Sequence, residues 1–270
     1  MKQLVRQDHK TALNRQVFGF YFLDLLVIGL AMGAIMISAL MLLPSQSSAK
    51  QVEQIVHDYL MREPQLIYDA LEELQQREQA EKLEKMNLAV LKHQNELYSN
   101  PSTPVGGNTD GDVTLVEFFD YRCGYCRHVM PSVEALLKHD KGVKLVFKDL
   151  PILGEESERA ARAALASRKQ GAYEQFHFAL MQADDLSEAG IVALAEANSL
   201  DAKQLLKDMT QPDIDQVIDD NRKLAEELGV DGTPMFIIGN KVIPGAADLD
   251  QLKNLVKEAR ESGRSRLAQG

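Results

Sequence analysis

The only two cysteines of the 270-residue chain, Cys123 and Cys126, are separated by two residues and lie between two strand-like segments. Residues 113–119 are rich in β-branched and aromatic side chains, which predicts a strand, and residues 143–148 predict a second strand. Between them, residues 123 to about 139 have helical content. The order strand, helix, strand is that of a parallel βαβ unit, so we expect the cysteine pair where a helix follows a strand.

The segments after this unit predict an α/β domain with a helical insertion. Residues from about 155 to 228 have helical patterns and no strand candidate, and their alanine-rich start favours a helix. Two short strands are then expected at 235–238 and 241–243, joined by the hairpin signal Gly239-Asn240. An amphipathic helix at 249–259 follows. We therefore assign residues 112–270 to one domain.

The N-terminal region contains an apolar segment, Leu25 to Leu43, of 19 residues without a charge. At about 1.5 Å per residue, a helix of this length crosses most of a hydrocarbon layer of ~30 Å. Four basic residues precede it, whereas only Lys50 follows within the next dozen residues. This asymmetry predicts that the N-terminus is cytoplasmic and that the chain after Pro44 is exported.

Residues 1–49 fit either a signal anchor or a signal peptide. Ser47 and Ala49 have the small side chains required before a signal peptidase site, so cleavage near Ala49 leaves a soluble protein. The apolar run, however, is longer than the roughly 7 to 15 residues of a signal peptide, which favours an uncleaved anchor at residues 25–43. Either alternative exports both cysteines to a compartment in which disulfides persist.

A helical segment is expected at residues 50–97, followed by a linker at 98–111 that has two prolines and three glycines. Apolar residues recur at three- and four-residue spacing, and Pro64 suits the first turn of a second helix. The stripe has a gap between Leu74 and Leu83, which counts against a regular long coiled coil. We favour a stalk for self-association over a helical pair folded back onto the main domain.

The net charge of −10 and the isoelectric point near 5.2 argue against a nucleic-acid partner, because contacts to phosphates need clustered Lys and Arg.

A Cys-x-x-Cys pair is compatible with four kinds of chemistry. A zinc site needs further ligands, and the chain has no other cysteine. A c-type haem needs histidine after the second cysteine, where Arg127 stands. A structural bridge would close a very small loop and remove little entropy from the unfolded chain. Redox chemistry is favoured, with no metal and no cofactor beyond the Cys123–Cys126 disulfide.

The expected position at the start of a helix favours the thiolate of Cys123, because unpaired backbone N–H groups and the positive end of the helix dipole lie there. Arg122 and Arg127 add positive potential, whereas Glu117 and Asp120 oppose it. The spacing predicts that Cys123 forms a mixed disulfide and that Cys126 resolves it.

The motifs "VEFFDYRCGYC" and "GVDGTPMFIIGN" resemble the exported thioredoxin-fold disulfide oxidoreductases of the DsbA type. With its N-terminal helical segment, the chain is similar to the ScsC-like members that function like DsbC. The resemblance covers about residue 52 to the C-terminus. It implies a thioredoxin fold with an inserted helical subdomain, located in the periplasm and, with an uncleaved anchor, attached to the inner membrane.

The resemblance also implies roles for individual residues. Cys123 matches the exposed nucleophile and Cys126 its buried partner, while Thr233 and Pro234 match a cis-proline loop that binds peptide substrates. Glu117, six residues before Cys123, matches a buried acid that accepts a proton from the resolving thiol. A solvent-facing carboxylate is the alternative for Glu117. Lys148 is a weaker candidate for its ion-pair partner.

Gly124 and Tyr125, between the cysteines, distinguish subclasses. Oxidases of the DsbA type carry Pro-His there, whereas Gly-Tyr and a threonine before the cis-proline resemble DsbC-type isomerases. We therefore expect a disulfide isomerase or reductase that acts on cysteine-containing exported proteins, forms homo-oligomers and exchanges electrons with a DsbD-like or DsbB-like membrane partner. A DsbA-like net oxidase is the first alternative. A non-catalytic interaction module, or one that binds copper through its thiols, is the alternative of another class.

Overall fold

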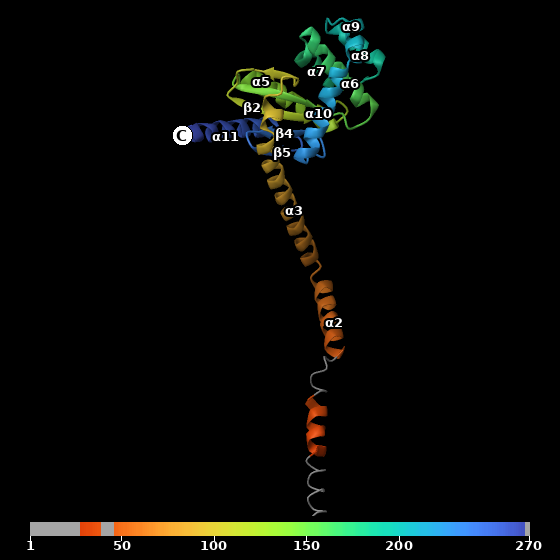
Figure 1. Cartoon of the computed structure of the whole chain (residues 1–270), viewed down its shortest axis with the longest axis vertical. Helices are drawn as coiled ribbons and strands as arrows, with labels where there is room; N and C mark the ends of the chain where they lie inside the picture. The colour runs from red at the N-terminus through yellow and green to blue at the C-terminus, as the bar shows by residue number, and fades with distance from the viewer. Residues whose placement is uncertain (1–27, 39–45, 268–270) are drawn as a thin grey trace, which may run out of the picture. The chain divides into compact units, whose positions relative to one another are not determined.

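The computed structural model describes residues 28–38 and 46–267 of the chain, and these fall into two units divided between Gln75 and Gln76 (Figure 1). The predicted membrane segment, 25–43, lies partly outside the described residues, and its described part, 28–38, is helical. Within the described ranges, no helix has both the length and the apolar character needed to cross a membrane. The anchor at residues 25–43 therefore stays a prediction.

Helix α2, Gln46–Arg62, and the first part of α3, Gln65–Lys92, belong to the first unit. The break between them confirms the helix start predicted at Pro64. The apolar side chains of both helices are between 47% and 67% exposed at the positions of the predicted stripe: Val52, Ile55, Val56, Tyr59, Ile67, Leu71 and Leu74. A helix in water is stabilised mainly by packing of its apolar face, so this stripe is a surface without a partner among the described residues.

The second unit is built on a five-stranded sheet of order β1-β3-β2-β4-β5. Strands β2 and β3 are parallel, and the other neighbouring pairs are antiparallel, which confirms the thioredoxin-like α/β fold. The strands have the bounds Val105–Gly107 (β1), Val113–Phe119 (β2), Val143–Asp149 (β3), Met235–Ile238 (β4) and Lys241–Pro244 (β5).

Helices cover both faces of this sheet and form the expected insertion between β3 and β4. In Figure 1, α6 to α9 gather beside the strands. The helices of this unit that follow α3 are α4 (Gln94–Tyr98), α5 (Gly124–His139), α6 (Glu155–Ser167), α7 (Tyr173–Gln182), α8 (Glu188–Ala197), α9 (Ala202–Asp208), α10 (Pro212–Leu228) and α11 (Leu249–Leu267), with a 3₁₀ turn at Arg168–Gln170.

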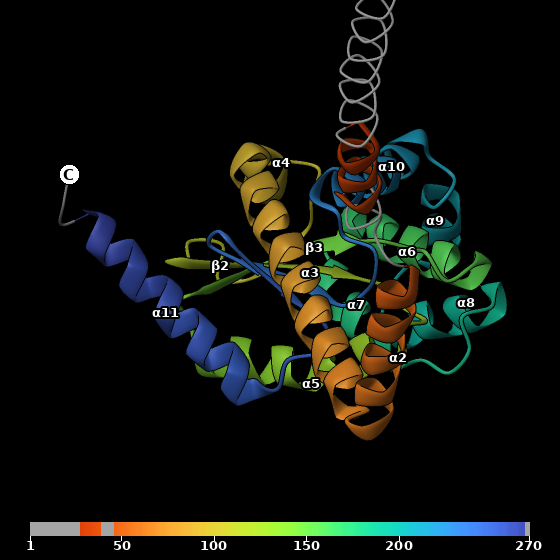
Figure 2. The same ribbon diagram turned by 90° about the horizontal axis from the view of Figure 1, so that it is seen from below.

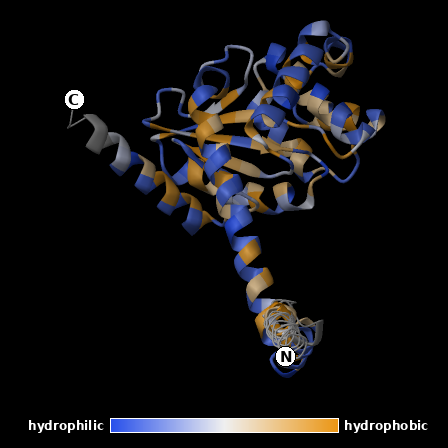
Figure 3. Cartoon of the chain, turned by 60° about the horizontal axis from the view of Figure 1, so that its bottom comes forward, coloured by the Kyte–Doolittle hydropathy of each residue, from blue (hydrophilic) through white to orange (hydrophobic). Residues whose placement is uncertain are grey.

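The two faces of the sheet bury separate cores. Because side chains alternate along a strand, Leu115 and Phe119 of β2 face the core that contains α5 and α11, whereas Val116 and Phe118 face the core that contains α4, α10 and the end of α3. In Figure 2, α5 and α11 lie on one side of the strands and α4 on the other. In Figure 3 the strands consist mainly of hydrophobic residues, whereas the helices contain both hydrophilic and hydrophobic residues. We call the face that packs against α5 and α11 the cysteine face, after Cys126, and the face that packs against α4 and α10 the lysine face, after Lys148.

The end of the segment predicted as a stalk packs against the lysine face. Met86, Val90 and Leu97 are at most 3% exposed and lie in the same core as Val116 of β2. The expected linker, residues 98–111, contains β1, which pairs with β3 through backbone hydrogen bonds that need no apolar pattern. The part of the stalk that belongs to the first unit therefore ends at Gln75.

Candidate active site

The cysteine pair lies at the start of α5, at the carboxyl end of β2. Cys123 is the N-cap residue, and its Sγ accepts a hydrogen bond from the backbone N–H of Cys126 at 3.4 Å. Cys123 is 6% exposed and Cys126 is fully buried, so the implied difference in exposure is present but small. The sulfur of Cys123 occupies the position at which the first N–H groups of a helix favour an anion.

The Thr233–Pro234 segment lies against the cysteines because β4, which begins one residue later, pairs with β2. The Thr233–Pro234 peptide bond is cis, as the resemblance implied. The thiol of Cys123 donates a hydrogen bond to the carbonyl oxygen of Thr233 at 3.2 Å. Two segments that are 110 residues apart in the sequence thus meet at one sulfur atom.

Gly124 and Tyr125 form the exposed part of the site. The Tyr125 side chain is 70% exposed, and a Cβ atom added to Gly124 would meet nothing within 4 Å. This geometry leaves room for a polypeptide next to Cys123. It does not by itself distinguish an isomerase from an oxidase.

Glu117 is buried on the cysteine face, 3% exposed, so the alternative of a solvent-facing carboxylate is wrong. Burial raises the pKa of Glu117 from its ordinary value of 4.5 to about 8. Burial also raises the pKa of the Cys126 thiol, and the negative charge of Glu117 adds to this rise. A neutral form is therefore favoured for each group, and a proton that leaves one is attracted by the other.

Lys148 does not pair with Glu117. The register of β2 and β3 places Glu117 beside Phe147, so Lys148 lies on the lysine face. There its Nζ donates to the carbonyl oxygen of Glu96 at 2.7 Å and to Oγ1 of Thr103 at 2.9 Å. The prediction of an ion pair is wrong because the register, which the sequence did not define, separates the two side chains.

Asp120 connects the cysteine turn to the loop between β3 and α6, a role that the sequence analysis missed. The buried carboxylate accepts hydrogen bonds from the backbone N–H groups of Arg122, Ile152 and Leu153, at 2.7, 2.8 and 3.0 Å, and from Oγ of Ser157 at 2.7 Å. A carboxylate just after a predicted strand was the available signal. Because these donors already share its charge, Asp120 acts mainly as a positioning group.

The two arginines near the cysteines are also engaged. Arg122 forms an ion pair with Glu156 of α6. Arg127 donates to the carbonyl oxygens of Met181, at 2.8 Å, and Ala183. These contacts tie the start of α5 to the helical insertion.

A second buried acid, Asp149, lies at the end of β3 and was not predicted from the sequence. Its carboxylate accepts hydrogen bonds from the hydroxyls of Tyr121, at 3.3 Å, and Tyr173, at 2.6 Å. Burial raises the pKa of Asp149 to about 7 and lowers that of His177, 3.0 Å from the Tyr121 hydroxyl, to about 3. This network joins the cysteine turn to helix α7.

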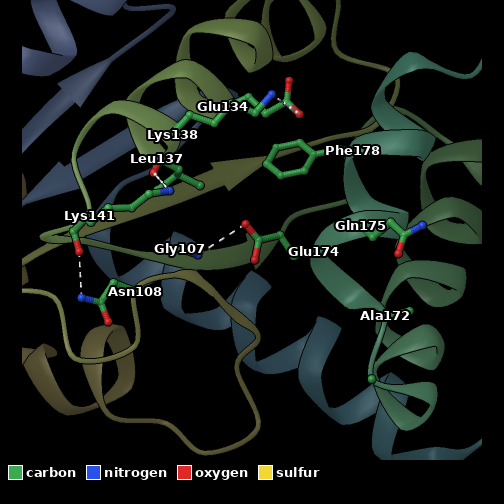
Figure 4. A pocket seen from close by; sticks show the side chains of 11 residues that line it. Gly107, Asn108, Glu134, Leu137, Lys138, Lys141, Ala172, Glu174, Gln175 and Phe178 are labelled. Carbon is green, nitrogen blue, oxygen red and sulfur yellow. Dashed lines mark hydrogen bonds and ion pairs between the residues drawn. The ribbon is translucent and has the colours of Figure 1, made fainter.

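A cavity of 710 Å³ lies away from the cysteines, between α5, α7 and the end of β1 (Figure 4). Figure 4 shows the Glu174 side chain directed at Gly107. Its Oε1 accepts a hydrogen bond from the backbone N–H of Gly107 at 3.4 Å. Lys138 pairs with Glu134 on its wall. Among the described residues, no group of three or more His, Cys, Asp or Glu side chains is arranged to hold a metal ion.

Two family models match the chain. The model of the DSBA-like thioredoxin domain matches residues 114–257, which is more than half of the chain and includes the cysteines and the Thr233–Pro234 segment. The model of the copper resistance protein ScsC N-terminal domain matches residues 50–81. The two matches correspond to the sheet-containing domain and to the region around α2 and the first half of α3.

Solved structures agree with these matches. A thioredoxin-like oxidoreductase from Silicibacter pomeroyi is 45% identical, with a TM-score of 0.60 over 62% of this chain and 98% of that chain. ScsC from Proteus mirabilis in a transitional conformation is 30% identical, with a TM-score of 0.61 over 81% of this chain and 100% of its own. A periplasmic thioredoxin-like protein from Salmonella enterica serovar Typhimurium is 32% identical, with a TM-score of 0.54 over 62% and 95% of the two chains.

Curated relatives include proteins of different lengths. The probable disulfide bond formation protein D of Bacillus cereus is 28% identical over 60% of this chain and 81% of its own length. The first relatives by similarity are Na⁺/H⁺ antiporters NhaA, such as NhaA 3 of Salinispora tropica, 30% identical over 60% of this chain. The chain spans only about a quarter of the length of those antiporters, 25% for NhaA 3.

Proposed function

The chain belongs to the DSBA-like thioredoxin domain family, and on this premise we propose that it is an exported thiol:disulfide oxidoreductase acting through Cys123 and Cys126. The observation that carries the proposal is the contact between Cys123 Sγ and the Thr233 carbonyl oxygen, with Cys126 buried one helical turn behind. A sulfur at a helix N-terminus, beside a backbone segment that can bind a peptide, suits thiol–disulfide exchange.

The first step is attack by the Cys123 thiolate on one sulfur of a client disulfide. The bond between Cys123 and that sulfur forms while the client S–S bond breaks, and the second client sulfur leaves as a thiolate. In isomerisation, a client thiolate then attacks the bound client sulfur. This restores the Cys123 thiolate, and the number of disulfides in the client is unchanged.

Reduction and oxidation use Cys126. After transferring its proton to the Glu117 carboxylate, Cys126 attacks the sulfur of Cys123, and the client leaves with both of its cysteines reduced. The two electrons come from the enzyme, which is left with the Cys123–Cys126 disulfide and requires a DsbD-like donor. Oxidation of a client is the reverse sequence and requires a DsbB-like acceptor.

Serine substitutions at the two cysteines test this proposal. Cys123→Ser should abolish insulin reduction and rescue of scrambled ribonuclease, whereas Cys126→Ser should still attack clients and accumulate mixed disulfides with them. An unchanged rate for Cys123→Ser would contradict an enzymatic role. Retention of partner binding by that variant would then favour the non-catalytic interaction module, whereas a module that binds copper through both thiols should lose copper.

We favour an isomerase or reductase over an oxidase because Gly124-Tyr125 and Thr233 resemble the DsbC-type pattern. The relatives named disulfide bond formation protein D support the oxidase as the second candidate. The redox state of the cysteine pair in cells distinguishes the two. Trapping free thiols with a maleimide should find Cys123 and Cys126 mostly reduced in an isomerase or reductase, and mostly oxidised in an oxidase.

The exposed stripe on α2 and the start of α3 supports a homo-oligomer. Several sites on one assembly could then face the same misfolded client. Deletion of residues 46–75 stops before Met86 and leaves the lysine face covered. The deletion should lower the molar mass measured by light scattering to that of a monomer and slow ribonuclease rescue more than insulin reduction. An unchanged mass would contradict the oligomer.

A substitution at a single position provides a matched test of the oligomer. Ile55→Asp places a charge in the stripe, at a side chain that is 67% exposed, while Gln54→Asp introduces the same charge at a neighbouring exposed polar position. Only Ile55→Asp should dissociate the assembly, because it alone interrupts an apolar contact.

Location in the periplasm, attached to the inner membrane through residues 25–43, is the proposed setting. The distribution of basic residues and the need for a compartment that permits disulfides support it. Carbonate extraction of membranes tests the attachment. The full chain should stay in the pellet, and a chain processed near Ala49 should be released.

A further inference from the structure

Exposed large apolar side chains near the cysteines lie at two places, the start of α5 and the loop between β3 and α6. Within residues 112–263, the strongly exposed large apolar side chains are Tyr125, between the cysteines, and Ile152 and Leu153, which are 47% and 50% exposed. Ile152 and Leu153 lie between β3 and α6, where their backbone N–H groups are bound by Asp120. The loop is thus held beside the cysteine turn although its side chains remain in solvent.

Ile152 lines a hollow of 520 Å³ whose lining extends to Asp231, two residues before Thr233. Apolar side chains dominate its floor, and three charged side chains stand at its rim. The hollow is lined by Leu150, Ile152, Arg222, Ala225, Glu226, Gly229, Val230 and Asp231. The neighbouring Leu153 lines neither this hollow nor the one of 550 Å³ on the other side of Ile152.

Two of the three rim charges already have partners. Arg222 forms ion pairs with Glu158 and with Asp219, and Asp231 lies 2.5 Å from Nζ of Lys82. A charged group that entered the hollow would lose its hydration and would have to compete for these partners. An uncharged apolar group is favoured because it gains the burial of its surface without that cost.

The position of the hollow selects which part of a client reaches it. Asp231, at its rim, is two residues from Thr233, whose carbonyl oxygen lies 3.2 Å from Cys123 Sγ. An extended polypeptide advances about 3.3 Å per residue. When a client cysteine is joined to Cys123, the side chains two or three residues away from that cysteine therefore come within reach of the hollow.

We propose that this hollow is a specificity subsite, which binds an apolar client side chain two or three residues from the reacting cysteine, with Ile152 as its central contact. This inference rests on the proposed exchange activity and names the client class of that site: segments whose cysteine is flanked by apolar residues, as in unfolded chains. Ile152 determines specificity and takes no part in the chemistry.

Paired peptides test the subsite on the full chain. Each peptide contains a cysteine in a mixed disulfide with a thiol chromophore, and leucine or serine occupies one of the positions two or three residues before or after it. At one or more of these positions the native enzyme should favour leucine about tenfold in kcat/KM, the range for a modest change in an apolar pocket. The Ile152→Ser variant should lose this preference.

Leu153→Ser is the matched control, because it removes a similar exposed apolar side chain from the same loop and should keep the preference. Loss of the preference in both variants, or a native enzyme without a preference at any position, would overturn the subsite. If the native enzyme reacts with none of the peptides, exchange itself is contradicted. Reaction with all of them at equal rates contradicts the subsite alone.

Discussion

Each face of the central sheet buries an ionisable side chain from a central strand, Glu117 of β2 on the cysteine face and Lys148 of β3 on the lysine face, and the two differ in their hydrogen bonds. On the lysine face, burial lowers the pKa of Lys148 to about 8, but its Nζ has hydrogen bonds to Glu96 and Thr103. On the cysteine face, burial raises the pKa of Glu117 to about 8, and the described part of the chain supplies no hydrogen bond to its carboxyl group. The lysine face thus provides hydrogen bonds to the ammonium group of Lys148. The cysteine face instead favours the neutral form of Glu117, whose charge would raise the pKa of Cys126 further.

This difference separates a structural role from a chemical one. A buried polar group normally has a hydrogen-bond partner, and Lys148 follows this rule. Lys148 fixes the position of α4 through the Glu96 carbonyl and so helps to close the lysine face. Glu117 has no comparable hydrogen bond among the described residues, which supports the proposed exchange of its proton with Cys126.

The largest effect is expected for the pH dependence of stability at Glu117. In the unfolded chain Glu117 loses its proton near pH 4.5, whereas in the folded chain it retains the proton until about pH 8. The folded state therefore binds more protons between these values, and stability falls as pH rises through this window. Since one pKa unit corresponds to about 1.4 kcal/mol, the full contribution is on the order of 5 kcal/mol.

Glu117→Gln removes this titration. Relative to the native protein, the variant should gain stability steadily from pH 4.5 to pH 8, as measured by urea unfolding at several pH values. Glu188→Gln, at an exposed position on α8, is the control and should leave the profile nearly unchanged. A constant difference between Glu117→Gln and the native protein would mean that Glu117 is ionised in the folded state.

The second effect concerns the closing of the lysine face by α4. Leu97→Ala removes a fully buried side chain from the core of that face and should destabilise the protein by about 3 kcal/mol. Leu91→Ala, at a position that is 48% exposed, should cost less than about 0.5 kcal/mol. Equal, small changes in the free energy of unfolding would show that α4 is not part of the fold.

These helices also mark the limit of what the sequence could predict. The strands at 113–119 and 235–238 were predicted with the bounds that the structure has, because β-branched residues act locally. The spacing of Met86 and Val90 predicts an apolar stripe but not the surface that covers it, which depends on contacts with residues far along the chain. The short strand β1 is held by backbone pairing and leaves no apolar signal.

The same limit applies to the site. The cysteines and the Thr233–Pro234 segment were found because their motifs are compact in the sequence. Glu117 and Lys148 lie on opposite faces because of the register of β2 against β3. A shift of that register by one residue would have placed both side chains on the same face. Asp120 and Asp149 act through partners more than 20 residues away, so their roles became visible only in the fold.

The third effect is a pH dependence of stability caused by Lys148, between about pH 8 and pH 10.5. Its pKa of about 8 in the folded state is below the ordinary 10.5, so between these values the unfolded chain binds the extra proton. Stability should therefore rise with pH in the native protein relative to Lys148→Met, by about 3 kcal/mol between pH 8 and 10.5. Lys144→Met, on the same strand but partly exposed, is the control. A falling difference would mean that Lys148 is more readily protonated when folded.

The smallest effect expected is on the rate of exchange, and it is the one that assigns chemistry to the cysteine face. Glu117→Gln retains the shape of the side chain but cannot accept a proton from Cys126, so resolution of the mixed disulfide should slow about tenfold. The slowing should be greatest near pH 8, where a larger fraction of native Glu117 is ionised, and should shrink toward pH 6, where native Glu117 is also protonated. Attack by Cys123 on a client, measured in Cys126→Ser, should be unaffected by the substitution. Stopped-flow measurement of both steps in Glu117→Gln and Lys148→Met compares the two faces. Only Glu117→Gln should slow the resolving step. An equal slowing in both variants would mean that Glu117 has only a structural role.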